Sequence, residues 1–240
     1  MMPFEINCDM GEDIGNDAVL MPYLDACSVA CGGHIGDYDS MKETVQLAKK
    51  YGVKIGAHPS FPDREGFGRR MINILPEALE QSLFEQIKAF DQVCQEEEVS
   101  MEHIKPHGAL YHLISIEKET ASIVIRVIKQ FPEITLLAPW ESEVARLASG
   151  DGVGVRWEGF ADRYYANDRT LVPRNHPDAV LHDPEKAAAQ VQSIITRSVL
   201  LSNSGESVPM KAATFCVHGD NPAALAILRR LHQLKNEQPI

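Results

Sequence analysis

The sequence predicts an α/β fold, a distorted seven-stranded (β/α) barrel of the TIM-like kind, formed as one domain by residues 1–240. Two observations favour this fold class. Short apolar segments alternate seven times with amphipathic helical patterns, which is typical of a parallel sheet with crossover helices. Polar residues follow nearly every segment, as they do around the mouth of a closed barrel. The alternative is an open, doubly wound sheet, but such a sheet normally binds its ligand at one switch point.

Seven segments have the length and apolar character of buried parallel strands. They are residues 4–9, 26–31, 53–57, 101–105, 134–138, 153–157 and 214–218. Because the carboxyl ends of parallel strands meet at one end of a barrel, we expect the residues that follow these segments to share one face.

The predicted helices begin at capping residues and carry apolar residues at helical spacing. A capping box of Ser40 and Glu43 predicts the start of the helix after the second strand, and Gly52 predicts its end. Further helix starts or apolar stripes are found at Pro76, at 121–128, at 144–147, at Asp183-Pro184 and at Asn221-Pro222.

The composition argues against several classes of function. A net charge of −11 opposes any general attraction to nucleic acid. No run of about 18 uncharged apolar residues is present, so we expect no membrane span. The five cysteines form no CxxC motif, and the start "MMPFEINCDMGED" lacks the basic region of a signal peptide. We therefore expect a cytoplasmic protein with reduced thiols.

Four of the nine histidines lie at the carboxyl ends of predicted strands, each beside glycine or proline. They are His34 in "CGGHIGD", His58 in "GAHP", His107 in "KPHGALY" and His218 in "VHGD". One histidine in such a place is more often structural, but four around one rim predict a functional cluster. Acidic and amide side chains follow the first, sixth and seventh strands, namely Asn7, Asp9, Glu12, Glu158 and Asp220.

Lys105 ends an apolar strand, immediately before Pro106. An ammonium group is costly to bury there unless a carboxylate is its partner. In a closed barrel, Asp9 or Asp220 is the expected partner. Both acids also have structural interpretations, because Asp9 is placed to cap the first helix and Asp220 to cap the last.

Two long loops on the predicted active face are rich in arginine. "IGAHPSFPDREGFGRR" follows the third strand, and "FADRYYANDRTLVPRNHPDAV" follows the sixth. Together they carry Arg64, Arg69, Arg70, Arg163, Arg169 and Arg174. Because guanidinium groups match carboxylates and phosphates in two-point contacts, a small anionic ligand is expected. The alternative is that these arginines only pin the loops, through Asp63, Glu65, Asp162 and Asp168.

The absent motifs narrow the chemistry further. The sequence contains no G-x-x-x-x-G-K-[ST] nucleotide loop and no G-x-S-x-G elbow. Acid–base or metal-assisted polar chemistry, with water or a carboxylate as nucleophile, is therefore favoured.

Six motifs in order resemble the LamB/YcsF family. They are "NCDMGED", "ACGGHIGD", "IGAHPSFPDREGFGRR", "IKPHGALY", "EGFADRYY…LVPR" and "CVHGD". The resemblance implies a seven-stranded barrel akin to the glycoside hydrolase/deacetylase group. It also implies that the chain functions as the A component of an ATP-dependent 5-oxoprolinase. With partner subunits B and C, this enzyme opens a small anionic lactam, 5-oxoproline, to L-glutamate. Because no nucleotide loop is present, we expect ATP, the co-substrate, to be bound mainly with the partners.

Roles follow for individual residues under that resemblance. Asp9 is the candidate general base, oriented by His58 or Lys105, and His107 or His218 would protonate the leaving nitrogen. The candidate substrate-binding residues are Asn7, Glu12, His34, Arg69, Arg70, Glu158, Arg163, Arg174 and Asp220.

Two rival functions stay open at the level of sequence. The first is a metal-dependent, deacetylase-like hydrolase of a small amide or carbohydrate, in which Asp9, His34 and His58 hold one divalent ion. The second is a non-catalytic subunit whose rim only binds the substrate.

Overall fold

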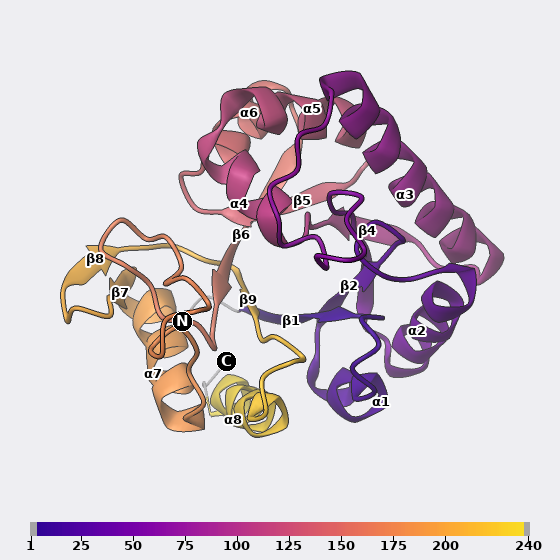
Figure 1. The fold of residues 1–240 in the computed structure, drawn as a ribbon. Coiled ribbons are helices and arrows are strands. Elements are labelled where there is room, and N and C mark those ends of the chain that lie inside the picture. The colour runs from indigo at the N-terminus through magenta and orange to yellow at the C-terminus, as the bar shows by residue number, and fades with distance from the viewer. Residues whose placement is uncertain (1–3, 238–240) are drawn as a thin grey trace.

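The barrel is closed by seven parallel strands. The computed structural model describes residues 4–237, and its sheet runs β1-β2-β3-β4-β5-β6-β9, with β9 paired to both β6 and β1 (Figure 1). The strands are β1 (Glu5–Met10), β2 (Ala26–Ala30), β3 (Lys54–His58), β4 (Met101–Ile104), β5 (Thr135–Pro139), β6 (Gly154–Phe160) and β9 (Thr214–Cys216). The predicted closed barrel is confirmed, and the open sheet is wrong.

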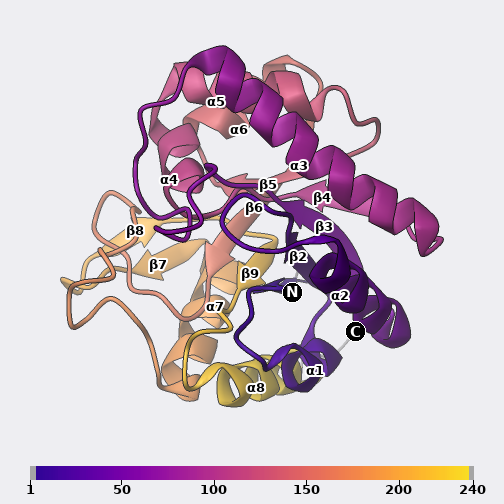
Figure 2. The ribbon, with the colours of Figure 1, turned by 45° about the vertical axis from the view of Figure 1, so that its right-hand side comes forward.

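Helices surround the barrel on its outer side (Figures 1 and 2). They are α1 (Asp17–Leu20), the 3-10 turn η1 (Met21–Tyr23), α2 (Tyr38–Tyr51), α3 (Pro76–Glu96), α4 (Gly108–Ile116), α5 (Lys118–Ile128), α6 (Glu143–Gly150), α7 (Pro184–Arg197) and α8 (Ala224–Asn236). Among residues 4–237, no helix combines the length and apolar character needed to cross a bilayer.

The helix ends confirm some predicted caps and correct others. Gly52 ends α2 in the left-handed conformation, as predicted. The capping box, however, consists of Asp37 and Ser40 rather than Ser40 and Glu43, because Ser40 occupies the third helical position. The Asp37 carboxylate accepts from the Ser40 backbone N–H at 2.9 Å. The helix therefore begins one turn earlier than the sequence predicts.

The last helix begins later than Asn221-Pro222 predicts, at Ala224. The Asn221 side chain accepts from the Ala223 backbone N–H at 3.0 Å and so builds a turn ahead of the helix. Asp220 does not cap α8, and its carboxylate binds arginines instead.

An antiparallel hairpin of β7 (Val199–Leu201) and β8 (Ser207–Pro209) lies outside the barrel beside α7 (Figure 1). The sequence analysis did not find it, because three-residue strands carry too few positions to show alternation. The loop between β6 and α7 is mostly irregular, as expected, with two isolated bridges, Arg163 to Val180 and Tyr165 to Leu171.

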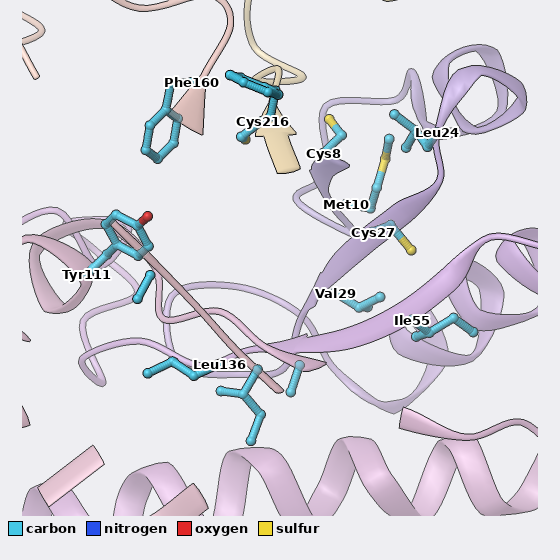
Figure 3. Packing of buried hydrophobic residues seen from close by; sticks show 14 of the residues in the cluster. Cys8, Met10, Leu24, Cys27, Val29, Ile55, Tyr111, Leu136, Phe160 and Cys216 are labelled. Carbon is cyan, nitrogen blue, oxygen red and sulfur yellow. The ribbon is translucent and has the colours of Figure 1, made fainter. Parts of the chain in front are cut away.

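Alternation along β1 separates the core from the site. Cys8 and Met10 belong to the hydrophobic cluster between sheet and helices (Figure 3). Side chains alternate across a strand, so Asn7 and Asp9 point to the barrel interior. All five cysteines are free and buried. One strand thus anchors the core and presents polar groups inward.

The barrel interior is tightly filled next to Gly56 in β3. A Cβ atom at Gly56 would lie 2.3 Å from the His103 ring, which is buried and lies 3.1 Å from the Ser28 hydroxyl. Burial lowers the pKa of His103 to about 3, so this ring stays neutral. Only glycine fits there without a shift of the ring.

We predict that Gly56→Ala lowers the free energy of unfolding by about 1–3 kcal/mol, because the added methyl overpacks the interior. Urea denaturation measures this. Gly150→Ala is the matched control, since its added Cβ would meet no atom of the described residues within 4 Å beyond its chain neighbours and the backbone of its own helix. A Gly56→Ala protein as stable as the control would show that the interior can yield.

Candidate active site

The carboxyl ends of the strands open into one cavity of about 640 Å³. Its wall includes Asp9, Glu12, His58, Lys105, His107, Tyr111, Glu158, Phe160, Arg163 and His218. These side chains come from segments that follow or end β1, β3, β4, β6 and β9, which are far apart in the sequence. The predicted convergence of acidic, imidazole and guanidinium groups at one mouth of the barrel is therefore observed.

Lys105 is almost fully buried in the site, with 2% of its surface exposed. Its ammonium Nζ lies 2.8 Å from Asp9 Oδ1 and 3.0 Å from Glu158 Oε1. Burial opposes the charged form, but the carboxylate charges outweigh it, so the pKa of Lys105 lies well above its ordinary value. Of the two carboxylates that the sequence offered as partners of Lys105, Asp9 is the one that pairs with it, and Asp220 does not.

The Asp9 carboxylate is shared between two basic neighbours. Oδ1 accepts from Lys105, and Oδ2 lies 3.4 Å from His58 Nε2. Burial alone would raise the pKa of Asp9, but its interactions with His58 and Lys105 together hold that pKa well below its usual range. The carboxylate therefore stays ionised.

Glu158 and Tyr111 present polar atoms that are not satisfied within the described part of the chain. Both Glu158 carboxylate oxygens and the Tyr111 hydroxyl are buried without a hydrogen-bond partner there. The 3.0 Å contact of Glu158 with Lys105 is thus an ion pair that lacks hydrogen-bond geometry. The sequence analysis missed Tyr111, whose only signal was a tyrosine four residues after His107, on the same helical face. Buried, unpaired groups on a cavity wall are suited to ligand contacts.

Three histidines and Glu12 form a second cluster beside Asp9. His34 and His107 stack with ring centroids 3.8 Å apart, and His58 Nε2 lies 2.9 Å from His107 Nδ1. Glu12 Oε1 lies 3.2 Å from His34 Nε2, 3.4 Å from His107 Nδ1 and 3.8 Å from His58 Nε2. Burial lowers the pKa of both His34 and His107.

This cluster is the part of the site that could hold a metal ion. Glu12, His34, His58 and His107 each offer one ligand atom, and these four atoms lie within 4.8 Å of one another. The sequence analysis grouped Asp9 with His34 and His58 instead. Because the Asp9 carboxylate pairs with Lys105, Glu12 rather than Asp9 is the carboxylate grouped with the three imidazoles.

Asp162 and His218 form a third, separate pair. Asp162 Oδ1 lies 2.8 Å from His218 Nδ1, and Oδ2 accepts from the His218 backbone N–H and from Asn221 Nδ2. Burial would raise the pKa of Asp162, but the His218 charge and these hydrogen bonds lower it below its ordinary value. The sequence analysis treated Asp162 only as a loop partner, and it missed this orienting contact.

The arginine loops meet at Asp220. Arg69 and Arg174 both contact Asp220 Oδ2, at 3.1 and 2.7 Å, and so join the loop after β3 to the loop after β6. Arg163 is buried, lines the cavity and donates to the carbonyl oxygens of Val172 and Ala179. These arginines both pin the loops and border the cavity.

Some predicted substrate-binding residues do not lie on the cavity wall. Arg70 is half exposed and pairs with Asp63 in the loop after β3. Asn7 donates to the Thr214 hydroxyl at 2.8 Å behind the wall. His34 lies behind His107, within the histidine cluster.

We predict that Lys105→Met lowers the free energy of unfolding by about 3–5 kcal/mol, because it leaves two buried carboxylates without their counter-charge. Chemical denaturation measures the loss. Lys129→Met removes an exposed lysine paired with Asp151 and should cost less than about 1 kcal/mol. Equal losses for the two variants would contradict the electrostatic account of Lys105.

Comparisons with known proteins agree over nearly the whole chain. The model of the LamB/YcsF family matches residues 4–240. The A component of the 5-oxoprolinase of Symbiobacterium thermophilum is 42% identical over 233 residues, which are 95% of this chain and 89% of that protein. The corresponding 5-oxoprolinase component of Pyrococcus abyssi is 40% identical over 245 residues, covering 100% of this chain and 96% of the relative.

A solved structure agrees with the fold. The crystal structure of the lactam utilization protein from Thermus thermophilus superposes with a TM-score of 0.91 at 32% identity. The match covers 98% of this chain and 97% of that one. Sequence motifs, relatives and fold lead to the same conclusion: this chain belongs to the LamB/YcsF family.

Proposed function

We propose that this chain is the A component of an ATP-dependent 5-oxoprolinase and carries the hydrolytic step. With partner subunits B and C it would open the lactam ring of 5-oxoproline to L-glutamate while ATP is hydrolysed. The observation that carries the proposal is one cavity in which Asp9, Lys105, Glu158 and His218 converge, in a chain whose relatives carry that name.

The cavity wall offers complementary groups to each part of 5-oxoproline. The substrate carboxylate would lie near Arg163 and Arg174, since guanidinium groups pair with carboxylates in two-point contacts. The Glu158 carboxylate, which pairs with Lys105 but accepts no hydrogen bond from the described residues, would accept the lactam N–H, and the Tyr111 hydroxyl would donate to the substrate. Such contacts satisfy buried polar atoms that otherwise stay unpaired.

ATP is needed because the lactam amide is resonance-stabilised in an unstrained ring. We propose that the lactam oxygen accepts the γ-phosphoryl group of ATP, giving ADP, on a nucleotide site formed mainly with the partners. Water then adds to the ring carbon, and breaking the C–N bond gives γ-glutamyl phosphate. A second water releases phosphate, so that 5-oxoproline, ATP and two waters yield glutamate, ADP and phosphate.

Asp9 is the proposed acceptor for the proton of the attacking water. Lys105 holds Oδ1, so Oδ2, which also lies 3.4 Å from His58 Nε2, is the oxygen that would bind the water. Because its pKa is depressed, Asp9 is a weaker base than an isolated carboxylate. It would orient the water and take the proton late, when the new C–O bond has made that proton acidic.

His218 is the proposed acid for the ring nitrogen. Asp162 binds its Nδ1, and this contact leaves Nε2 for the cavity. His107, the other sequence candidate, has Nε2 at the Phe67 carbonyl and Nδ1 within the histidine cluster. Protonation of the ring nitrogen decides whether the ring opens. The adduct of water and the phosphorylated lactam opens when it loses the protonated nitrogen, but it only regenerates the lactam when it loses phosphate.

We predict that Asp9→Asn lowers kcat of the reconstituted complex by about 10²–10⁴-fold, the usual contribution of a positioned acid or base. Glutamate formation from 5-oxoproline and ATP is the assay, and the exposed Asp151→Asn serves as the matched control. Turnover within tenfold of the wild type would favour a subunit that only binds substrate.

We predict that His218→Gln raises the ratio of ADP formed to glutamate formed above one. Without its acid, the intermediate loses phosphate more often and returns to lactam, so ATP is consumed without ring opening. Measuring ADP and glutamate in one reaction tests this. A ratio that stays at one would remove His218 from the role of acid.

A further inference from the structure

We propose that Glu12, His34, His58 and His107 form a binding site for one divalent transition-metal ion, with zinc as the best match. Three imidazole nitrogens and one carboxylate oxygen are a donor set that zinc accepts in tetrahedral geometry. The proposal goes beyond the proposed function, because ion binding here requires neither ATP, nor lactam, nor partner subunits.

Four of the six distances among the ligand atoms lie near those of a tetrahedron around one ion, and all six lie within 4.8 Å. Ligands about 2.0–2.1 Å from zinc lie about 3.3 Å from one another in tetrahedral geometry. Glu12 Oε1 lies 3.2 Å from His34 Nε2 and 3.4 Å from His107 Nδ1. The His58 Nε2 to His107 Nδ1 distance is 2.9 Å, and the His58 Nε2 to Glu12 Oε1 distance is 3.8 Å.

Backbone carbonyls fix the tautomers of two of these rings. His58 Nδ1 lies 2.6 Å from the Lys105 carbonyl oxygen, and His107 Nε2 lies 2.9 Å from the Phe67 carbonyl oxygen. A carbonyl oxygen only accepts, so both nitrogens carry hydrogen. The remaining ring nitrogens, His58 Nε2 and His107 Nδ1, therefore face each other 2.9 Å apart beside Glu12, where one cation would contact both. Such carbonyl contacts are typical partners of metal-binding histidines.

The loop after β3 closes over the cluster and holds it in shape. Phe67 packs edge-on against the rings of His34 and His107. Gly68 has a φ of +61°, and a Cβ atom there would meet His107 and His34 at 3.0 Å. The loop thus lies directly against the imidazoles, and a preorganised site loses less freedom when it binds an ion.

The site faces the cavity. Glu12, His58 and His107 all line it, beside Asp9 and Lys105. Four protein ligands complete a tetrahedral zinc ion, so a water or carbonyl oxygen would be polarised here as a fifth ligand, a coordination to which zinc sites can expand. The ion would therefore act on the same small substrate that the rest of the cavity contacts.

The test is zinc binding by the isolated full chain, without substrate, nucleotide or partners. After removal of metal with a chelator, calorimetric titration with zinc chloride should give one site per chain. Glu12→Gln and His107→Asn should each weaken zinc binding by at least the roughly 10–100-fold that loss of an outer-shell partner costs. Cobalt(II) should give the visible absorption of a four-coordinate ion in the wild type and lose it in both variants.

His232→Gln is the matched control, because His232 packs on Tyr23, away from the cluster. It should bind zinc as the wild type does. Absence of stoichiometric binding by the wild type would overturn the proposal, as would wild-type affinity in folded Glu12→Gln and His107→Asn proteins. Such a result would leave the 5-oxoprolinase assignment standing, since glutamate formation is measured separately.

Discussion

One buried lysine connects the parts of this site. The Lys105 ammonium holds Asp9 and Glu158 at the bottom of the cavity. The Lys105 carbonyl oxygen accepts from His58 and so fixes the orientation of the histidine cluster. A buried charge is tolerated only when its partners are in place, so the positions of β1, β4 and β6 depend on one another through this residue.

The closed barrel brings the residues around Lys105 to one end of the molecule. Parallel strands deliver their carboxyl ends to one mouth, where side chains from β1, β3, β4, β6 and β9 meet in one cavity. The loop after β3, which holds two prolines and two glycines, does not fill that mouth with regular structure. It carries Phe67 and Gly68 onto the histidines and Arg69 onto Asp220. Loop and barrel together place the charged groups around Lys105 beside a cluster with the donors of a metal site.

Much of this arrangement could be predicted from the sequence, because it follows from strand order. The seven strands, the four histidines at their ends and the pairing of Lys105 with Asp9 need only the rule that parallel strands share one edge. What could not be predicted depends on side-chain direction. Arg69 reaches Asp220 while its neighbour Arg70 turns to Asp63, and no pattern separates them.

The same limit applies to the cluster of Glu12 with the histidines. Gly11, with a φ of +70°, turns the chain after β1 and determines where Glu12 points, and a sequence does not reveal that turn. The sequence analysis did not single out Tyr111, whose hydroxyl lines the cavity without a hydrogen-bond partner among the described residues. The capping box was misplaced because Ser40 fits either the first or the third position of such a motif.

The central claim is that Lys105 and Asp9 act as one buried unit, and a double-mutant cycle on unfolding free energy tests it most directly. The variants are Lys105→Met, Asp9→Asn and their combination. The account predicts that the combined loss differs from the sum of the single losses by about 1–3 kcal/mol, the coupling of residues in contact. Losses that simply add would contradict it.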